Sequence, residues 1–250
     1  MRAILDWQIE MGATEAIGDA PVNRYGSPAT LQKPSAAAIS KVDPPAQDVI
    51  DPVAVARAAA SDATTMEALR AALSDYEHCE LKKGARNLVF SDGPAEARVM
   101  LLGEAPGRDE DLQGKPFVGR AGQLLDRMFG AIGMGRADPD TQRALYITNV
   151  LPWRPPQNRD PKPEEIAMLL PFVERHIELA APDLIVLIGN HACQALLGRK
   201  GITRLRGTWT IAAGRPALPM LHPAYLLRNP AAKREAWADL LELQAKLRTI

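Results

Sequence analysis

The stretch ARVMLLGEAPGRDEDLQGKPFVGRAG, residues 97–122, joins an uninterrupted apolar run to a loop of glycines, prolines and carboxylates. The apolar run at 97–103 lacks polar alternation, which is typical of a parallel strand covered on both faces. Three similar runs follow along the chain at 145–150, 184–189 and 218–222. Together these runs predict a central sheet of four, mainly parallel strands.

Amphipathic helical patterns lie between and after the apolar runs, at 121–133, 163–180, 190–198 and 230–247, and another begins near residue 61. Strands that alternate with helices are typical of α/β proteins with helices on both faces of the sheet. We therefore expect an α/β fold, a three-layer α/β/α sandwich around the four-stranded sheet.

The first sixty residues have a different composition. A helix-like segment at 1–22 precedes a stretch from about Pro21 to Ala60 that is rich in Ala, Pro, Ser and Asp. This stretch has few large apolar side chains to offset the entropy lost on ordering. We expect residues 1–60 to form an N-terminal extension with a linker, and residues 61–250 to form the folded catalytic domain.

Charge and cysteine content exclude several classes of protein. The 250 residues include 30 basic and 30 acidic side chains, so any surface for nucleic acid must be local. Cys79 and Cys193 are too few for a disulfide framework and suit a reducing compartment. The sequence has no apolar stretch long enough for a membrane helix. These features predict a cytoplasmic protein without a membrane partner.

Ligands of parallel sheets bind beyond the carboxyl ends of the strands. Four loops begin at such ends: GEAPGRDED (103–111), NVLPWRPPQNRDP (149–161), GNHA (189–192) and HPAYLLRNP (222–230). Three of them are dense in polar, glycine and proline residues, which favours function over simple connection.

The first loop carries four carboxylates within eight positions: Glu104, Asp109, Glu110 and Asp111. Gly107 can take a positive φ, so the loop can follow a tight path that holds the carboxylates in place. Capping of the next helix and binding of a divalent metal are two alternative interpretations. A dinucleotide site is not expected, because the loop lacks G-x-G-x-x-G and its charge would repel phosphate.

Two further strand ends carry polar side chains. Asn149 could cap the following turn, but its amide also offers the donor and acceptor that suit a nucleobase edge. His222 ends the last apolar run immediately before Pro223. The coincidence with the other polar strand ends favours a functional role for His222. The remaining histidines lie in helical patterns and are expected to be surface or core residues: His78, His176 and His191.

Three motifs, in their order and spacing, resemble those of the family 4 uracil-DNA glycosylases: GEAPGRDEDLQGKPFVGRAGQLLD, NVLPWRPPQNRDPKPEE and LHPAYLLRNP. The likeness covers about residues 66–246. It implies an enzyme that flips uracil out of DNA and hydrolyses its bond to deoxyribose, leaving an abasic site. Uracil-containing DNA is then the expected partner, and the enzyme is expected to be monomeric.

The resemblance also implies roles for individual residues. His222 would stabilise the anion that develops on uracil O2, Asn149 would read the polar edge of the base, and Phe117 would stack on its face. Glu104 and Glu110 are the candidate catalytic carboxylates, which would stabilise the cationic sugar and position water. The sequence does not divide this work between them, and Glu110 could instead exclude the methyl group of thymine. Two further residues are expected to bind substrate: Ala105 and Gly107.

The loop at 222–230 would enter the DNA, with Leu226, Leu227 or Arg228 as the wedge that fills the vacated stack. For Leu226, a place at the start of the last helix is an equal alternative. The predicted phosphate contacts are Arg120, Arg154 and Arg206. Arg206 belongs to the densest basic run, although such runs are often simply solvated.

One departure from the family concerns its [4Fe-4S] cluster, which the resemblance implies is held by four cysteines. The corresponding positions here are Tyr76, Cys79, Trp153 and Leu169. One thiolate cannot hold such a cluster, so we predict that the protein has no iron-sulfur cofactor. His78 and Cys79 could contribute to another metal site, but the sequence offers no further ligands at suitable spacing, so no metal-ligating residues are predicted. The bulky residues are expected to fill the vacated space by packing.

Two other functions remain open at this point. A catalytically weak relative could bind damaged DNA without excising the base. A metal-dependent hydrolase could use the carboxylates of the first loop, and a chelator would abolish its activity.

Overall fold

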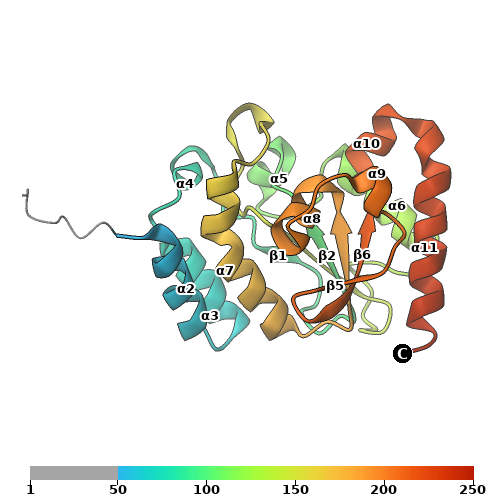
Figure 1. Cartoon of the computed structure of the whole chain (residues 1–250), viewed down its shortest axis with the longest axis horizontal. Coiled ribbons are helices and arrows are strands. Elements are labelled where there is room, and N and C mark those ends of the chain that lie inside the picture. Colours follow the sequence, from blue (N-terminus) through green and yellow to red (C-terminus); the bar gives the residue numbers. More distant parts are fainter. Residues whose placement is uncertain (1–49) are drawn as a thin grey trace, which may run out of the picture. The chain divides into compact units, whose positions relative to one another are not determined.

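The computed structural model describes residues 50–250 (Figure 1). The predicted helix-like segment at 1–22 and the part of the predicted linker that precedes residue 50 lie outside the described residues. Within the described range the sheet has six strands: β1 (Ser91–Asp92), β2 (Val99–Gly103), β3 (Leu145–Asn149), β4 (Leu184–Ile188), β5 (Thr210–Ala212) and β6 (Arg215–Met220). Their order across the sheet is β1-β3-β2-β4-β6-β5.

The four central strands, β3, β2, β4 and β6, pair in parallel, as the sequence predicted. The predicted strand number was too small, because β1 and β5 add antiparallel edges to this sheet. β1 has only two residues and β5 only three. Strands this short contain no apolar run, so the sequence pattern did not reveal them.

Helices follow most strands. The described α-helices are α2 (Pro52–Asp62), α3 (Met66–Asp75), α4 (Leu81–Gly84), α5 (Arg108–Gln113), α6 (Arg120–Gly130), α7 (Pro163–Ala180), α8 (Gly189–Leu197), α9 (Ile202–Leu205), α10 (Pro223–Arg228) and α11 (Lys233–Leu247). Two short 3₁₀ turns complete the elements, η2 (Pro156–Asn158) and η3 (Pro230–Ala232). The helices predicted near 121–133, 163–180, 190–198 and 230–247 correspond to α6, α7, α8 and α11.

The sheet separates two apolar layers, because alternate residues of each strand face opposite sides. Met100 and Leu102 of β2 join the core cluster that includes residues of α3, α7 and α8. Val99 and Leu101 join the cluster that includes residues of α6 and α11. Figure 1 shows α2, α3 and α7 on one side of the sheet and α6 and α11 on the other. This arrangement confirms the three-layer α/β/α sandwich.

Helix α2 corrects the linker prediction in part, because it lies within the stretch expected to be a linker. Asp51 caps it, accepting a hydrogen bond from the Val53 amide at 2.9 Å, and Pro52 occupies its first turn. The small residues Ala56 and Ala60 are buried against the main core. Alanine has the highest helix propensity and allows close approach, so an Ala-rich segment can form a packed helix without large side chains.

None of the described helices combines the length and hydrophobicity needed to cross a bilayer.

Candidate functional site

A cleft of about 580 Å³ lies at the carboxyl ends of the parallel strands. All four loops predicted from the sequence contribute to its lining. The first contributes Glu104, Ala105, Gly107 and Glu110, the second Asn149 and Asp160, the third Gly189 and His191, and the fourth His222, Tyr225 and Arg228. Phe117, from the segment between α5 and α6, completes the predicted set of substrate-binding residues. The structure therefore brings together every predicted catalytic and substrate-binding residue.

Phe117 is held in an unusual backbone conformation at the floor of this cleft. Its φ of 52° lies in the left-handed region, which is rare for a bulky residue. The Arg136 guanidinium donates to the carbonyls of Pro116 at 2.7 Å and Phe117 at 2.9 Å. At Gly122 an added Cβ would lie 1.7 Å from the Phe117 carbonyl oxygen. The close approach of α6 and the Arg136 contacts thus stabilise the strained residue.

Glu110 also contacts the segment that carries Phe117. Its carboxylate accepts hydrogen bonds from the backbone amides of Gly107 at 3.1 Å, Val118 at 3.0 Å and Gly119 at 2.9 Å. These bonds tie the first loop to the segment that carries Phe117. Three backbone donors satisfy much of the acceptor capacity of this carboxylate. Glu110 therefore lines the cleft mainly as a clamp between two loops.

His222 stacks against Phe117 in the lining of the cleft, with ring centroids 5.6 Å apart and planes inclined by 30°. Its Nδ1 accepts a hydrogen bond from the Ala224 amide at 3.1 Å. Burial lowers the pKa of His222, which favours the neutral ring. A neutral imidazole that accepts at Nδ1 carries its proton on Nε2. His222 can therefore donate one hydrogen bond from Nε2.

Asn149 ends β3 and is 5% exposed. Neither its Nδ2 nor its Oδ1 has a hydrogen-bond partner among the described residues. Such buried, unpaired polar atoms are rare in proteins and destabilise the fold. Gly103 leaves the space for this side chain, because an added Cβ there would lie 2.3 Å from Asn149 Oδ1 and 2.5 Å from the Phe117 ring. The amide is thus available to a ligand that supplies both a donor and an acceptor.

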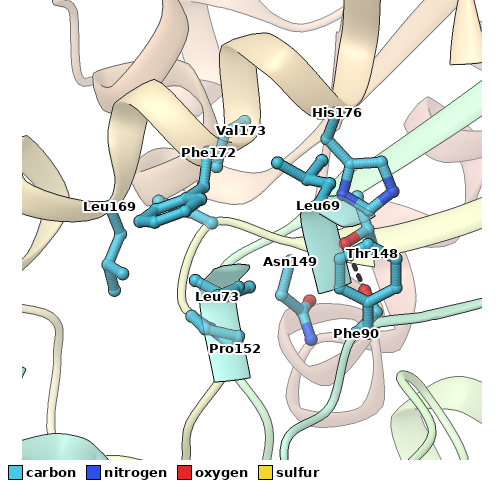
Figure 2. Close-up of a pocket in the computed structure, with 11 residues that line it drawn as sticks. Leu69, Leu73, Phe90, Thr148, Asn149, Pro152, Leu169, Phe172, Val173 and His176 are labelled. Atoms are coloured by element: carbon cyan, nitrogen blue, oxygen red, sulfur yellow. Dashed lines mark hydrogen bonds between the residues drawn. The ribbon is translucent and has the colours of Figure 1, made fainter. Parts of the chain in front are cut away.

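Asn149 also borders a much smaller cavity of about 10 Å³ on the α3 and α7 side of the sheet. Leu73, Leu169 and Phe172 are among the residues that line this small cavity (Figure 2). Beside them, Thr148 Oγ1 donates a hydrogen bond to the Phe90 carbonyl at 2.6 Å. A space of this size holds about one water molecule. The base-sized space is therefore the cleft, and the small cavity belongs to the core.

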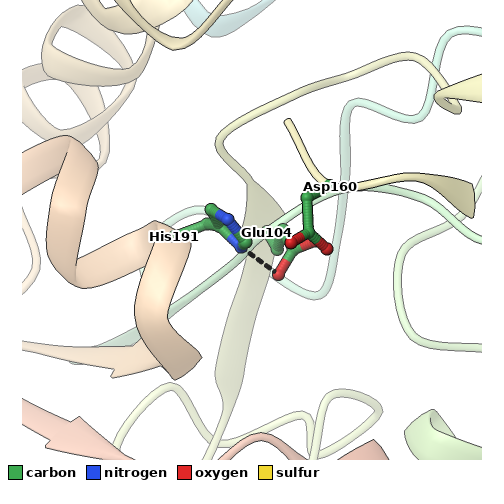
Figure 3. A group of neighbouring side chains, drawn as sticks. All are labelled: Glu104, Asp160 and His191. Carbon is green, nitrogen blue, oxygen red and sulfur yellow. Dashed lines mark hydrogen bonds and ion pairs between the residues drawn. The ribbon is translucent and has the colours of Figure 1, made fainter. Parts of the chain in front are cut away.

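Glu104 pairs with His191, the third residue of α8. Their Oε2 and Nδ1 atoms are 2.6 Å apart (Figure 3). The pKa of His191 is raised, first by its hydrogen bond with Glu104. One donor atom from each of Glu104, Asp160 and His191 lies within 4.8 Å of the others, a spacing compatible with a divalent cation. The hydrogen bond already explains the proximity of Glu104 and His191, so we assign no metal to this group.

His191 and Asp160 were not among the predicted site residues. His191 is buried, as expected of a core residue, but it also lines the cleft, which the sequence analysis did not predict. His191 does lie in a helix, as predicted. That helix begins at the carboxyl end of β4, so its first turn faces the cleft. The sequence contained this signal, since GNHA was one of the four loops expected at the binding edge. Tyr225 was also missed, and it is exposed in the same cleft.

The four carboxylates of the first loop do not share one site. Asp109 is exposed outside the cleft lining. Asp111 is buried, and its Oδ1 accepts hydrogen bonds from the amides of Arg86 at 2.8 Å and Asn87 at 3.2 Å. Only Glu104 and Glu110 reach the cleft, so a metal site built from this loop alone has no geometric basis.

Two of the residues predicted to contact DNA have structural roles instead. Arg206 pairs with the buried Asp239 and donates to the Glu235 carbonyl at 2.7 Å. Leu226 is fully buried in a core cluster with Leu124 and Leu221, so it cannot act as a wedge. The sequence pattern could not distinguish these contacts, because the partners come from distant parts of the chain.

The other predicted DNA contacts remain accessible to different degrees. Arg228 is exposed at the cleft, and Arg120 is exposed at the start of α6. Arg154 is half-buried, and its Nε donates to Asn158 Oδ1 at 2.7 Å. Leu227 is half-buried against the cluster that contains Leu226. Arg228 is therefore the predicted DNA contact that the cleft favours most.

The four positions that correspond to the cluster ligands of the family are all buried in one core cluster: Tyr76, Cys79, Trp153 and Leu169. The Tyr76 hydroxyl donates to the Pro52 carbonyl at 2.7 Å, and burial raises its pKa to about 12. Burial also raises the pKa of the Cys79 thiol. Trp153 and Leu169 offer no atom that ligates iron. These residues do not fit an iron-sulfur cluster, because only one thiol is present and its neighbours pack as core.

Comparisons with known proteins identify a family and several relatives of this chain. Residues 90–241 match the family model of the Uracil DNA glycosylase superfamily. A type-4 uracil-DNA glycosylase of Saccharolobus solfataricus is 36% identical over 181 residues, covering 68% of this chain and 81% of that protein. The Archaeoglobus fulgidus enzyme of the same name is 38% identical over 176 residues, covering 66% and 84%. The Thermotoga maritima enzyme is 41% identical over 156 residues, covering 60% and 77%. The stretch matched by the family model includes every residue that lines the cleft.

Proposed function

Because the chain belongs to family 4 of the uracil-DNA glycosylase superfamily and is a uracil-DNA glycosylase, we propose that it flips uracil out of DNA into the cleft and hydrolyses its N-glycosidic bond. The product is DNA with an abasic site. A base stacked in a duplex cannot present its glycosidic bond to protein side chains, so extrusion precedes the chemistry.

The observation that carries this proposal is the unpartnered amide of Asn149 beside Phe117 and His222. Uracil presents a donor at N3 and acceptors at O2 and O4. An amide complements a neighbouring donor and acceptor on one edge of this base. The aromatic ring of Phe117 offers a face on which the base can stack. Binding of uracil would therefore satisfy the two atoms that the free protein leaves unpaired.

His222 supplies the stabilisation of the leaving group. When the bond between C1′ and N1 breaks, both electrons stay with uracil, and the negative charge spreads to O2. The Nε2–H of neutral His222 can donate to that oxygen in the half-buried lining of the cleft. Donors of this kind are worth about 3–4 kcal/mol of transition-state stabilisation in other enzymes.

Glu104 acts on the deoxyribose, the other fragment formed when the glycosidic bond breaks. Departure of uracil leaves a sugar with oxocarbenium character, which a nearby carboxylate stabilises. Water then adds to C1′, and its proton passes to the carboxylate and on to solvent. Oε2 of Glu104 is engaged by His191, so Oε1 is the oxygen available to the sugar or to water. These contacts support Glu104 as the catalytic carboxylate and Glu110 as the residue that positions the loops through its three backbone bonds.

The DNA strand would pass over the fourth loop, where Tyr225 and Arg228 are exposed at the rim of the cleft. A phosphate suits Arg228, and an aromatic ring at this position can stack in the space that the flipped nucleotide vacates. The proposed activity places the enzyme at the first step of base-excision repair.

Release of uracil from a labelled oligonucleotide in EDTA tests the proposal. The wild type is compared with Glu104→Gln and His222→Leu, and with Asp109→Asn as a matched control. Asp109 is a carboxylate of the same loop as Glu104, but it lies outside the cleft lining. We expect excision by the wild type and the control, and a loss of about 100-fold or more in each cleft variant.

Each alternative function has its own result. Tight binding of uracil-containing DNA without excision would identify a damage-binding relative. Excision that stops in EDTA would identify a metal-dependent hydrolase.

A further inference from the structure

His191 is the one histidine besides His222 that lines the cleft among the described residues. It stands in the first turn of α8, which begins at the carboxyl end of β4, and it reaches across to Glu104 in the loop after β2. The proposed catalytic step uses Glu104 but gives no role to the ionisable ring of His191 that is hydrogen-bonded to it. The following inference rests on the proposed function.

The contact determines where the proton lies. The Nδ1 of His191 and the Oε2 of Glu104 are 2.6 Å apart. An ionised carboxylate can only accept a hydrogen bond, so the proton of this bond sits on His191. His191 is almost fully buried and Glu104 is partly buried, which limits the exchange of this bond with water. The bond therefore restricts the rotation of the carboxylate and leaves Oε1 directed away from α8.

We propose that His191 is a positioning residue for Glu104: its Nδ1–H holds one carboxylate oxygen so that the other faces the deoxyribose, and its charge sets the net charge of the pair. With neutral His191 the pair carries a charge of −1. With protonated His191 the pair is neutral overall and stabilises a cationic sugar less. The excision rate should then rise when His191 loses its proton.

Several charged groups around His191 determine the pH at which this occurs. The hydrogen bond with Glu104 raises the pKa of His191 above its ordinary 6.5, burial opposes this shift, Asp160 adds to it, and Lys200 opposes it. Glu104 lies in the loop after β2, Asp160 in the loop before α7, and Lys200 in the loop between α8 and α9. His222, at the start of α10, also faces the pair, and burial lowers its pKa. His222 therefore loses its proton at lower pH than His191, and the two titrations are separable.

Single-turnover excision between about pH 5 and 9 tests the proposal with two substitutions. In His191→Asn the amide nitrogen replaces Nδ1 as a neutral donor, so the carboxylate stays held but the pair cannot titrate. We expect the rate at high pH to remain within about threefold of wild type and the step above pH 6.5 to disappear. In His191→Leu both the donor and the titration are lost, so we expect a rate at high pH about tenfold below that of wild type, no step above pH 6.5, and unchanged affinity for the DNA.

An NMR titration of the His191 ring gives a readout that does not depend on activity. Glu104→Gln removes the acceptor charge, so the pKa of His191 should fall in this variant and stay unchanged in Asp109→Asn. Persistence of the acid-side step in His191→Asn, wild-type rates in His191→Leu, or an unshifted His191 pKa in Glu104→Gln would each overturn the proposal. A wild type that releases no uracil would instead contradict the proposed function, and the NMR titration would still decide whether the pair exists.

Discussion

The imidazole of His222 lies against the ring of Phe117, with centroids 5.6 Å apart and planes inclined by 30°. The two residues are 105 positions apart in the sequence. They meet because the segment after α5 and the loop after β6 both reach the same edge of the sheet. Their approach places a stacking surface and a hydrogen-bond donor on one side of the buried amide of Asn149.

Asn149→Leu should separate stability from activity. Asn149 has two buried polar atoms without a partner in the free protein, and an apolar side chain of similar size removes them. We expect the free energy of unfolding to rise by about 1 kcal/mol while excision falls by at least about 100-fold. Denaturant unfolding and an excision assay measure the two effects. A destabilised variant would indicate that the amide is paired in the free protein.

Gly122→Ala should disrupt the site through the backbone. The added Cβ would lie 1.7 Å from the carbonyl oxygen of Phe117, so α6 and the Phe117 segment must separate. We expect a loss of stability of about 2 kcal/mol or more, together with a large loss of excision. Gly130→Ala, at the end of the same helix, is the control, because nothing lies within 4 Å of its added Cβ. Thermal unfolding should show the control to be as stable as wild type or slightly more stable.

Alanine substitution should lower stability at Arg206 but weaken DNA binding at Arg228. Arg206→Ala leaves the buried Asp239 unpaired, so we expect a loss of about 3–5 kcal/mol in stability. Arg228→Ala should leave stability unchanged, weaken DNA binding and lower the slope of log K against log salt by about 1. Binding titrations at several salt concentrations check the second effect. An Arg206→Ala variant that is as stable as wild type but binds DNA poorly would show that Arg206 contacts phosphate and is not structural.

His176 should make the protein acid-sensitive. It donates to or accepts from the Tyr146 hydroxyl at 2.6 Å, stacks on Phe90, and burial lowers its pKa to about 3. The unfolded chain therefore binds a proton below pH 6.5 that the folded protein does not take up until about pH 3. Between these values His176 should lower the free energy of unfolding by about 1.4 kcal/mol for each unit of decreasing pH. In His176→Gln this contribution to the slope should vanish, and an unchanged slope would rule out His176 as its source.

The protein should purify without stoichiometric iron. Cys79 is the one thiol at the four positions that correspond to the family's cluster ligands, and Tyr76, Trp153 and Leu169 are buried beside it as core. Iron analysis and absorbance in the visible range measure the cofactor directly. We also expect Cys79→Ala to keep wild-type excision, with a small loss of stability from the packing defect. Stoichiometric iron that depends on Cys79 would contradict the prediction.

The sequence predicted the edge of the sheet at which the site lies, because the reason is local. Four apolar runs, each followed by a polar loop, are sufficient to place Glu104, Asn149 and His222 at one edge of a parallel sheet. The edge strands β1 and β5 were missed because strands of two or three residues carry no pattern. Helix α2 was missed because its Ala-rich composition resembles that of a linker, and only the packing of Ala56 and Ala60 reveals the helix.

The sequence by itself determined the fold class, the family and the residue types in the cleft, since these depend on periodicity, spacing and motif. Only the tertiary structure decided the role of each residue, because a role depends on which distant groups come into contact. Contact with Asp239 makes Arg206 structural, and three backbone amides make Glu110 a clamp. The contact with His191 leaves one oxygen of Glu104 available. Hydrogen bonds and ion pairs act over a few ångströms in space, and separation along the chain does not predict them.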